Sequence, residues 1–212
     1  MDNQTQIKRK TVIINSVLLG ESGVGKTSLI QRYVDKIFEL QVHSTIGLDF
    51  KQFQSYEDGI KYTIKFWDTA GQERFKEITK KYLRKKDCYV FVFDHSNLQS
   101  FEQIEKKYIK QMMEFSAEDA FNKPLFLVGN KSDIDDEKRV VRQVDIFNLA
   151  KNYGMRYFEV SCKLNENVNE LFEDIKNKTI KYIKENLNND VPNIQLTDKV
   201  DWNIQPQRNC KC

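Results

Sequence analysis

A glycine-rich segment between an apolar run and a helical pattern constrains this chain more than any other feature of its sequence. Residues 20–27 read Gly-Glu-Ser-Gly-Val-Gly-Lys-Thr and fit the pattern Gly-x-x-x-x-Gly-Lys-Thr. Residues 12–19 before it predict a buried strand, interrupted by the polar Asn15 and Ser16, and we expect a helix to begin near Lys26. The glycines allow successive backbone N–H groups to point at one anion, and the helix N-terminus adds a dipole that favours phosphate.

Residues 20–27 therefore predict a cradle for the phosphates of a nucleotide. The Lys26 ammonium supplies a point charge to the outer phosphates, and the Thr27 hydroxyl is a candidate Mg²⁺ ligand. A glycine-rich turn without a ligand is the simpler interpretation, but the flanking strand and helix are the context that the motif requires. The motif alone does not identify the base. The residues expected to contact phosphate are Ser22, Gly23, Val24, Gly25, Lys26, Thr27 and Ser28.

Short apolar runs and helical patterns alternate from the first strand to about residue 184. An Asp-Gly pair at 58–59 is typical of a hairpin turn. We expect strands at 12–19, 50–56, 60–66, 88–93, 125–128 and 157–160, and helices over 101–112 and 168–183. This order predicts an α/β fold, a doubly wound, mostly parallel six-stranded sheet with helices on both faces. We expect a short extension at 1–10, one domain at 11–184 and a flexible tail at 185–212.

The composition limits the classes of protein to consider. With 34 basic and 31 acidic residues among 212, the net charge is +3, which argues against a protein that coats nucleic acid, and we expect no nucleic-acid partner. The longest wholly apolar stretch, 88–93, is far shorter than the roughly 20 residues that span a bilayer. Residues 1–10 contain no apolar secretory signal, and the four cysteines form no disulfide framework, so we expect a reduced, cytosolic chain.

A second motif follows the strand predicted at 60–66. Residues 67–73 read Trp-Asp-Thr-Ala-Gly-Gln-Glu, and a carboxylate at the carboxyl end of a strand suits Asp68 as a partner of the Mg²⁺ site. Gly71 is a candidate to bring a backbone N–H close to the terminal phosphate, and Gln72 is a candidate to orient the attacking water. Taken alone, the segment also fits a simple polar turn.

A third motif, Asn130-Lys131-Ser132-Asp133, follows the strand predicted at 125–128 and indicates which base is bound. The Asp133 carboxylate can accept hydrogen bonds from the ring N–H and exocyclic amine of guanine, an edge that adenine lacks, and a site built this way rejects the wrong base. Lys131 can cover the base with its methylenes, and Asn130 can tie this loop to the cradle. A fourth segment, Ser161-Cys162-Lys163, can offer a backbone N–H to the guanine carbonyl. The four motifs in this order are far more specific together than any one alone.

These four motifs resemble those of the small GTPases of the Ras superfamily, and within it those of the Rab family. Segments 46–50 and 65–75 are similar to segments that mark Rabs, and the resemblance covers about residues 11–184. It implies a P-loop GTPase (G) domain that binds GTP or GDP with Mg²⁺ and hydrolyses GTP slowly. It also implies that the Thr45 hydroxyl completes the Mg²⁺ shell and that Phe38 packs against guanine. The residues that effectors would read are Ile46, Phe50, Trp67 and Tyr82.

The resemblance further implies a role in vesicle trafficking, with a set of protein partners. These are a guanine nucleotide exchange factor, a GTPase-activating protein, effectors, a Rab escort protein and a GDP-dissociation inhibitor. The implied protein is a monomer, lipid-anchored to the cytoplasmic face of intracellular membranes, that cycles with the cytosol.

The last three residues, Cys210-Lys211-Cys212, resemble the Cys-x-Cys ending of Rabs, which carries two geranylgeranyl groups. A C-a-a-X box is excluded because Asn209 stands four residues from the end. Stable anchoring takes two lipids, or one lipid and a polybasic patch, and residues 185–212 have a net charge of −1. Prenylation of both Cys210 and Cys212 is therefore expected. Two exposed thiols, or a metal-binding pair, are the simpler interpretations.

Three departures from the Rab pattern leave alternatives open. Val42 stands where the family usually has a tyrosine, Lys85-Lys86 replaces a small pair of residues, and Cys162 replaces an alanine. We interpret 80–81 and 84–86, which are basic, as a solvated helix face, and the alternative is that they belong to a surface that contacts a partner. The alternative functions are a P-loop ATPase or nucleotide kinase, which the guanine-specific Asp133 argues against, and a scaffold that holds nucleotide without hydrolysis, which Val42 would favour.

Overall fold

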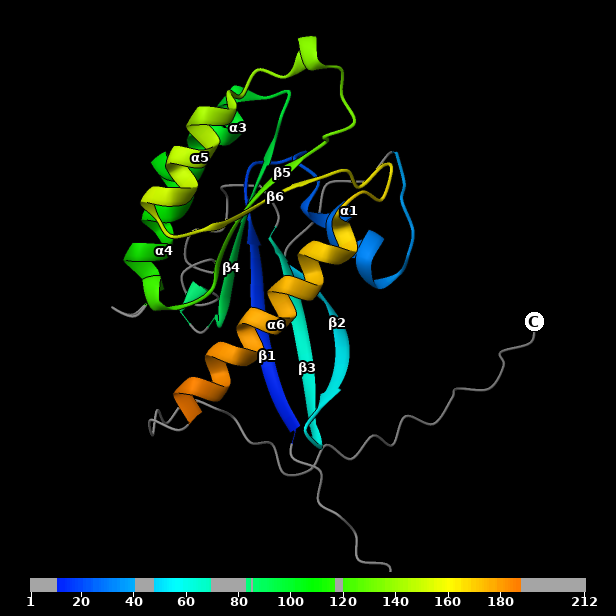
Figure 1. The fold of residues 1–212 in the computed structure, drawn as a ribbon, viewed down its shortest axis with the longest axis vertical. Helices are drawn as coiled ribbons and strands as arrows, with labels where there is room; N and C mark the ends of the chain where they lie inside the picture. The colour runs from blue at the N-terminus through cyan, green and yellow to red at the C-terminus, as the bar shows by residue number, and fades with distance from the viewer. Residues whose placement is uncertain (1–10, 41–47, 70–82, 85, 117–119, 188–212) are drawn as a thin grey trace, which may run out of the picture.

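The computed structural model describes residues 11–40, 48–69, 83–84, 86–116 and 120–187, and within these ranges the chain forms the α/β fold that the sequence predicts (Figure 1). The six strands stand in the order β2-β3-β1-β4-β5-β6, and every neighbouring pair is parallel except the hairpin β2–β3. Their bounds are β1 Thr11–Leu19, β2 Leu48–Glu57, β3 Ile60–Thr69, β4 Cys88–Asp94, β5 Leu125–Asn130 and β6 Arg156–Val160.

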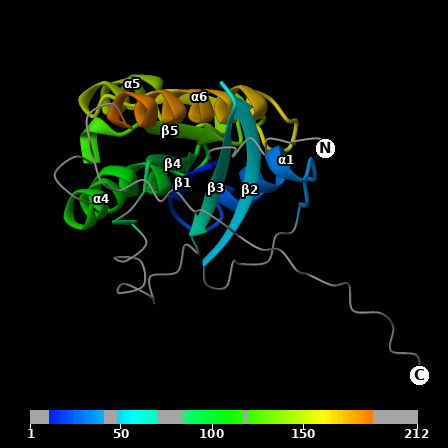
Figure 2. The same cartoon turned by 90° about the horizontal axis from the view of Figure 1, so that it is seen from below.

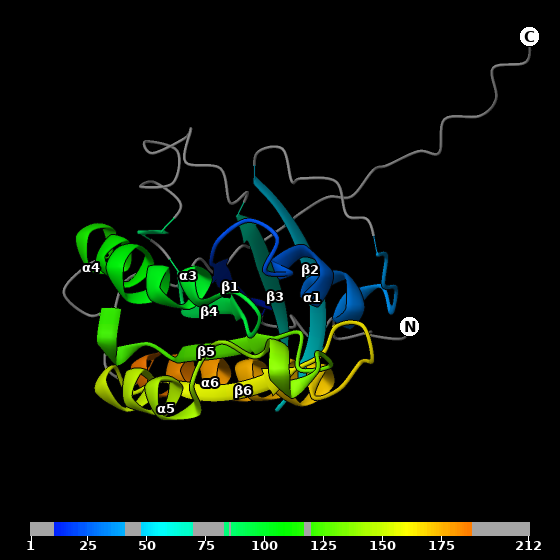
Figure 3. The ribbon, with the colours of Figure 1, turned by 90° about the horizontal axis from the view of Figure 1, so that it is seen from above.

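Helices cover both faces of this sheet, as expected for a doubly wound fold. The helices are α1 Lys26–Val34, α3 Leu98–Gln103, the π-helix η2 Ile104–Ile109, α4 Lys110–Phe115, α5 Gln143–Asn152 and α6 Val168–Leu187, with short 3₁₀ turns η3 Ala120–Asn122 and η4 Asp136–Lys138. Buried side chains of α1 and α6 share one core cluster with the sheet, and those of α3, η2, α4 and α5 share another. Figures 2 and 3 show α6 and α4 on opposite sides of β4.

Strand β4, one of the two central strands, explains how one sheet builds two cores. All seven residues of β4 are buried, and its successive side chains alternate between the two clusters, with Val90 and Val92 in one and Phe91 and Phe93 in the other. This is the pattern of a parallel strand covered on both faces.

The polar residues that interrupt the apolar run of β1 do not end the strand. The Asn15 side chain accepts a hydrogen bond from Trp67 Nε1 at 3.0 Å, and its backbone N–H donates to Asp87 Oδ2 at 2.7 Å. Because its polar groups have partners, Asn15 can sit within the sheet without the cost of an unsatisfied polar group.

The helical segment from Leu98 to Phe115 departs from the regular helix that its apolar spacing predicts. Asn97 caps its start by accepting from the Ser100 backbone N–H at 3.1 Å. The middle turns, Ile104–Ile109, are π-helical before α-helical geometry resumes at Lys110. Apolar spacing does not distinguish these two helical forms, so the sequence did not predict this change.

The last helix, α6, spans the domain and closes it at the hairpin. Lys184 near its end donates to Glu57 Oε2 at 3.0 Å and to Asp58 Oδ2 at 2.9 Å at the β2–β3 turn. None of the helices described here is long and apolar enough to cross a membrane.

Candidate functional site

The predicted motifs converge because they follow strands that run in the same direction. Strands β1, β3, β4, β5 and β6 are parallel, so their carboxyl ends lie along one edge of the sheet. In open α/β sheets this edge is where ligands bind. The cradle follows β1, Asp68 lies near the end of β3, and the other two motifs begin at the ends of β5 and β6.

The cradle takes its shape from glycines in backbone conformations that other residues rarely adopt. Gly25, the N-cap of α1, has a φ of 98°, and a Cβ there would lie 2.2 Å from Asn130 Nδ2. At Gly20 a Cβ would lie 2.1 Å from the Val92 carbonyl oxygen. Both positions therefore exclude a side chain by contact as well as by conformation. Ser22 and Gly23 are exposed, whereas Val24 is buried.

Lys26 is held at this turn as a buried cation. Its Nζ donates to the backbone oxygens of Gly20 at 2.7 Å and Glu21 at 2.8 Å. Burial lowers the pKa of Lys26 to about 8, against the opposing effect of the Asp68 carboxylate. Because little water surrounds the Lys26 ammonium, its electrostatic attraction to an anionic ligand is weakly screened and therefore strong.

Thr27 and Asp68 place two oxygen atoms that can ligate a metal ion side by side. Thr27 Oγ1 donates to Asp68 Oδ2 at 2.5 Å, and the Asp68 carboxylate is buried near the end of β3. Thr27 and its neighbour Ser28 form the first turn of α1. A hydroxyl and a carboxylate oxygen are ligands that suit Mg²⁺, so this pair fits the predicted metal site.

Asn130 joins the cradle to the segment that follows β6. Its Nδ2 donates to the Val24 carbonyl oxygen at 2.8 Å, and its Oδ1 accepts from the Cys162 backbone N–H at 3.3 Å. One buried carboxamide therefore sets the spacing between three loops. Burial raises the pKa of the Cys162 thiol to about 12, so the thiol stays protonated at neutral pH.

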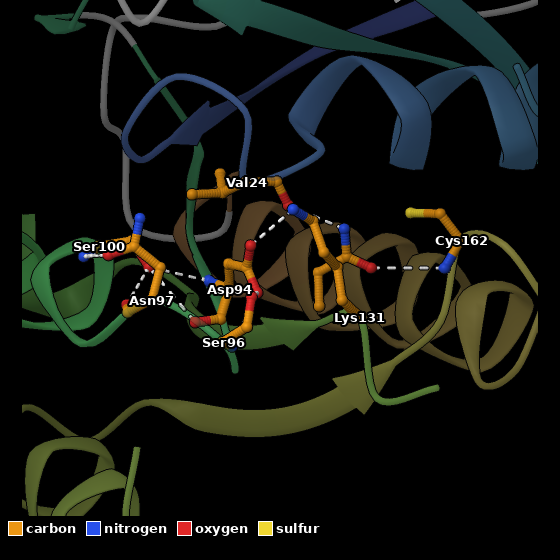
Figure 4. Close-up of polar contacts among 8 residues, drawn as sticks. Val24, Asp94, Ser96, Asn97, Ser100, Lys131 and Cys162 are labelled. Carbon is orange, nitrogen blue, oxygen red and sulfur yellow. Dashed lines mark hydrogen bonds and ion pairs between the residues drawn. The ribbon is translucent and has the colours of Figure 1, made fainter. Parts of the chain in front are cut away.

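Lys131 follows Asn130 in the motif at 130–133. Its side chain is held by an aspartate that the sequence did not reveal as part of the site. Lys131 has a φ of 65° and its Nζ lies 2.5 Å from Asp94 Oδ2 (Figure 4). Burial opposes ionisation of Asp94, but hydrogen bonds from Lys131 and Ser96 outweigh it and hold the pKa below its usual value. The signal was present in the sequence, since Asp94 ends the apolar run of β4 at this same edge.

Asp133 ends the motif at 130–133 and contacts the segment that follows β6. Both segments are expected to surround the base. Its Oδ1 accepts from Ser161 Oγ at 2.7 Å, and its Oδ2 lies 3.6 Å from Lys163 Nζ. Ser161 Oγ also accepts from the Leu164 backbone N–H at 3.0 Å. The carboxylate is thus oriented by a hydroxyl that is itself fixed by the backbone.

Arg32 of α1 is a further residue that the sequence did not reveal. It donates to the backbone oxygens of Cys162 and Lys163, at 2.8 Å each, and its guanidinium lies 5.3 Å from the centre of the Phe38 ring. Arg32 therefore contacts both the segment after β6 and the half-buried Phe38.

Two of the aromatic residues expected to contact effectors, Phe50 and Trp67, form a pair on the β2–β3 hairpin. The Phe50 and Trp67 rings lie 4.9 Å apart, and Phe50 is 40% exposed. Lys86 was predicted to lie on a solvated helix face, and this is wrong, because it is only 4% exposed with its Nζ 3.9 Å from the Trp67 ring. A cation–π contact with Trp67 accounts for its burial, which lowers the pKa of Lys86 to about 8. Arg84 is exposed, as predicted.

The remaining predicted residues stay predictions, because they lie outside the described part of the chain. They are Val42, Thr45, Ile46, Gly71, Gln72, Lys80, Lys81, Tyr82, Lys85, Cys210 and Cys212.

Comparison with known proteins gives a consistent result over most of the chain. The Ras family profile matches residues 15–201. The Ras-related protein RABG3f of Arabidopsis thaliana is 37% identical over 211 residues, covering 96% of this chain and 98% of the relative. The Ypt/Rab-type GTPase Rab7 of Neurospora crassa is 35% identical, with the same two coverages. The Ras-related protein Rab-15 of Rattus norvegicus is 41% identical, covering 78% of this chain and 76% of the relative.

The close approach of Gly25 to Asn130 generates a prediction. Gly25→Ala should weaken nucleotide binding by about 100-fold or more, because the methyl group displaces the Asn130 side chain and strains the turn. Gly154→Ala is the matched control, since Gly154 also has a positive φ but has no atom within 4 Å of its added Cβ. Isothermal titration with GDP measures both. Equal affinities for the two variants would contradict the role given to this contact.

Proposed function

Since this chain belongs to the Ras family and, within it, to the Rab small GTPases, we propose that it is a membrane-anchored switch that binds GTP or GDP with Mg²⁺ and recruits effectors in its GTP form. One observation carries the proposal. The Asn130 carboxamide ties the cradle with its buried Lys26 to the loops around Asp133, so one edge of the sheet holds the cation that we assign to phosphate and the carboxylate that we assign to guanine.

The proposed chemistry of hydrolysis begins with charge placement. Lys26 binds the outer phosphates, and Thr27, Asp68 and Thr45 would hold Mg²⁺. When bound, Mg²⁺ supplies positive charge that neutralises the phosphate oxygens. Gln72 orients the attacking water, and a GTPase-activating protein supplies the further charge that fast turnover needs.

The proposed switching step depends on the groups that interact with Mg²⁺ and the terminal phosphate. With GTP bound, Thr45 and the Gly71 backbone N–H are drawn toward the terminal phosphate, which orders the two segments that contain them. Hydrolysis removes that phosphate and releases both segments. The effector surface that contains Ile46, Phe50, Trp67 and Tyr82 would therefore be complete only in the GTP form.

The base preference separates this proposal from a P-loop ATPase or nucleotide kinase. Asp133→Asn should shift the preference from guanine to xanthine nucleotides by about 100-fold or more, because the amide N–H₂ donates to the carbonyl that xanthine carries in place of the amine. Competition between labelled GDP and unlabelled XDP, GDP and ADP measures the shift. Strong binding of ATP or ADP by the unchanged protein would favour the ATPase.

A second prediction separates a working switch from a scaffold that holds nucleotide without hydrolysis. Gln72→Leu should bind GTP normally but lose hydrolysis stimulated by an activating fraction from cell extract, because no group then orients the water. Single-turnover hydrolysis of labelled GTP, with and without that fraction, measures the loss. A variant that is stimulated as strongly as the unchanged protein would remove Gln72 from this role.

Membrane anchoring is proposed to rest on Cys210 and Cys212, with two prenyl groups attached by way of a Rab escort protein and shielded in the cytosol by a GDP-dissociation inhibitor. Replacing both cysteines by serine should move a fluorescently tagged copy from intracellular membranes to the cytosol, because no lipid remains and the tail offers no polybasic patch. Membrane flotation measures the distribution. Each single serine variant tests whether one lipid is enough, and unchanged flotation of the double variant would exclude this anchor.

A further inference from the structure

The cradle contains a carboxylate that the proposed function leaves unexplained. Glu21 lies in the phosphate-binding turn, and its carbonyl oxygen accepts from Lys26 Nζ at 2.8 Å. A carboxylate attached to this turn opposes the binding of phosphate unless another charge neutralises it.

The structure supplies that charge from a different element. Glu21 Oε1 lies 3.0 Å from Lys107 Nζ and accepts from the Tyr108 hydroxyl at 2.9 Å. All three side chains are buried or partly buried, so the ion pair is less screened than one on the open surface. Lys107 Nζ also lies 4.9 Å from the centre of the Tyr108 ring, which helps to fix its position.

Glu21 links Lys107 to the cation that would face the phosphates. Lys26 Nζ donates to the Glu21 carbonyl oxygen at 2.8 Å, and the Glu21 carboxylate lies 3.0 Å from Lys107 Nζ. Glu21 therefore joins the two cations, through its backbone to one and through its side chain to the other.

Lys107 and Tyr108 belong to η2, the π-helical part of the helix that runs from Leu98 to Phe115. Short π-helical segments inside α-helices are frequent at functional sites. The start of the same helix is tied to the other half of the site, because Ser100 Oγ accepts from the Asp94 backbone N–H at 3.0 Å and Asp94 pairs with Lys131 (Figure 4). One helix thus contacts the cradle at its middle and is linked at its start, through Asp94, to Lys131.

We propose that Lys107 is a positioning residue of the nucleotide site: it neutralises the Glu21 carboxylate and, with Tyr108, holds it against η2, which slows the release of bound nucleotide. This inference rests on the proposed function, because it assumes that the cradle holds the phosphates of GDP or GTP. It goes beyond that function by assigning nucleotide retention to a residue that belongs to none of the four nucleotide motifs.

The charge logic predicts an unusual order among variants. Lys107→Met should speed the release of fluorescently labelled GDP about fivefold, because it leaves an uncompensated carboxylate beside the phosphates. Adding Glu21→Gln removes that carboxylate and should return the rate to within about twofold of the unchanged protein. Lys107→Arg keeps the charge and should release GDP at the original rate. The matched control is Lys106→Met, which breaks the exposed Lys106–Glu102 pair on the same helix and should have no effect.

Stopped-flow release of the labelled GDP into excess unlabelled GDP measures these rates, and the ³¹P resonance of the bound β-phosphate reports the field at the cradle. Lys107→Met should shift that resonance, and the double variant should restore it, which a purely structural defect elsewhere would not do. A double variant that releases GDP faster than Lys107→Met, or a Lys107→Met rate equal to that of Lys106→Met, would overturn the inference while leaving the proposed function intact. An unchanged protein that binds no GDP would overturn both.

Discussion

The Asn130 carboxamide is the contact on which the rest of the site depends. It donates to the Val24 carbonyl oxygen and accepts from the Cys162 backbone N–H, so it spans the loops that follow β1, β5 and β6. A buried amide that satisfies both a donor and an acceptor fixes the relative position of the groups it joins, because breaking either bond leaves a polar group without water. The absence of a side chain at Gly25 makes room for it. The distance from the glycine-rich turn at 20–27 to the Asp133 carboxylate is thus set by contacts within the protein itself.

Much of this arrangement could be predicted from sequence because it rests on local patterns. The apolar run of β4 and the Asp-Gly turn between β2 and β3 each depend on neighbouring residues, and the structure has both. The cradle motif also carries its own context, since the strand before it and α1 after it follow from apolar spacing. The parallel order of the strands then brings the motifs to one edge without any need to know side-chain contacts.

The contacts that the sequence did not reveal join residues far apart in the chain. Arg32 and Cys162 are separated by 130 positions, and Glu21 and Tyr108 by 87. No spacing rule relates such pairs. For Lys86 the sequence pattern gave a wrong prediction. A basic cluster predicts side chains exposed to solvent, whereas the Lys86 ammonium is buried against the Trp67 ring. The positions of Lys86 and Trp67 in the sequence do not indicate that the two side chains meet.

The contact between Lys184 and the β2–β3 turn fixes the direction in which the last helix crosses the domain. Helix α6 starts soon after the end of β6, at the nucleotide edge, and its 20 residues extend about 30 Å to the hairpin turn at the opposite edge. The C-terminal end of α6 therefore lies at the edge of the sheet opposite the cradle. One helix bridges the two edges, and the Lys184 ion pairs fix its last turns to the hairpin.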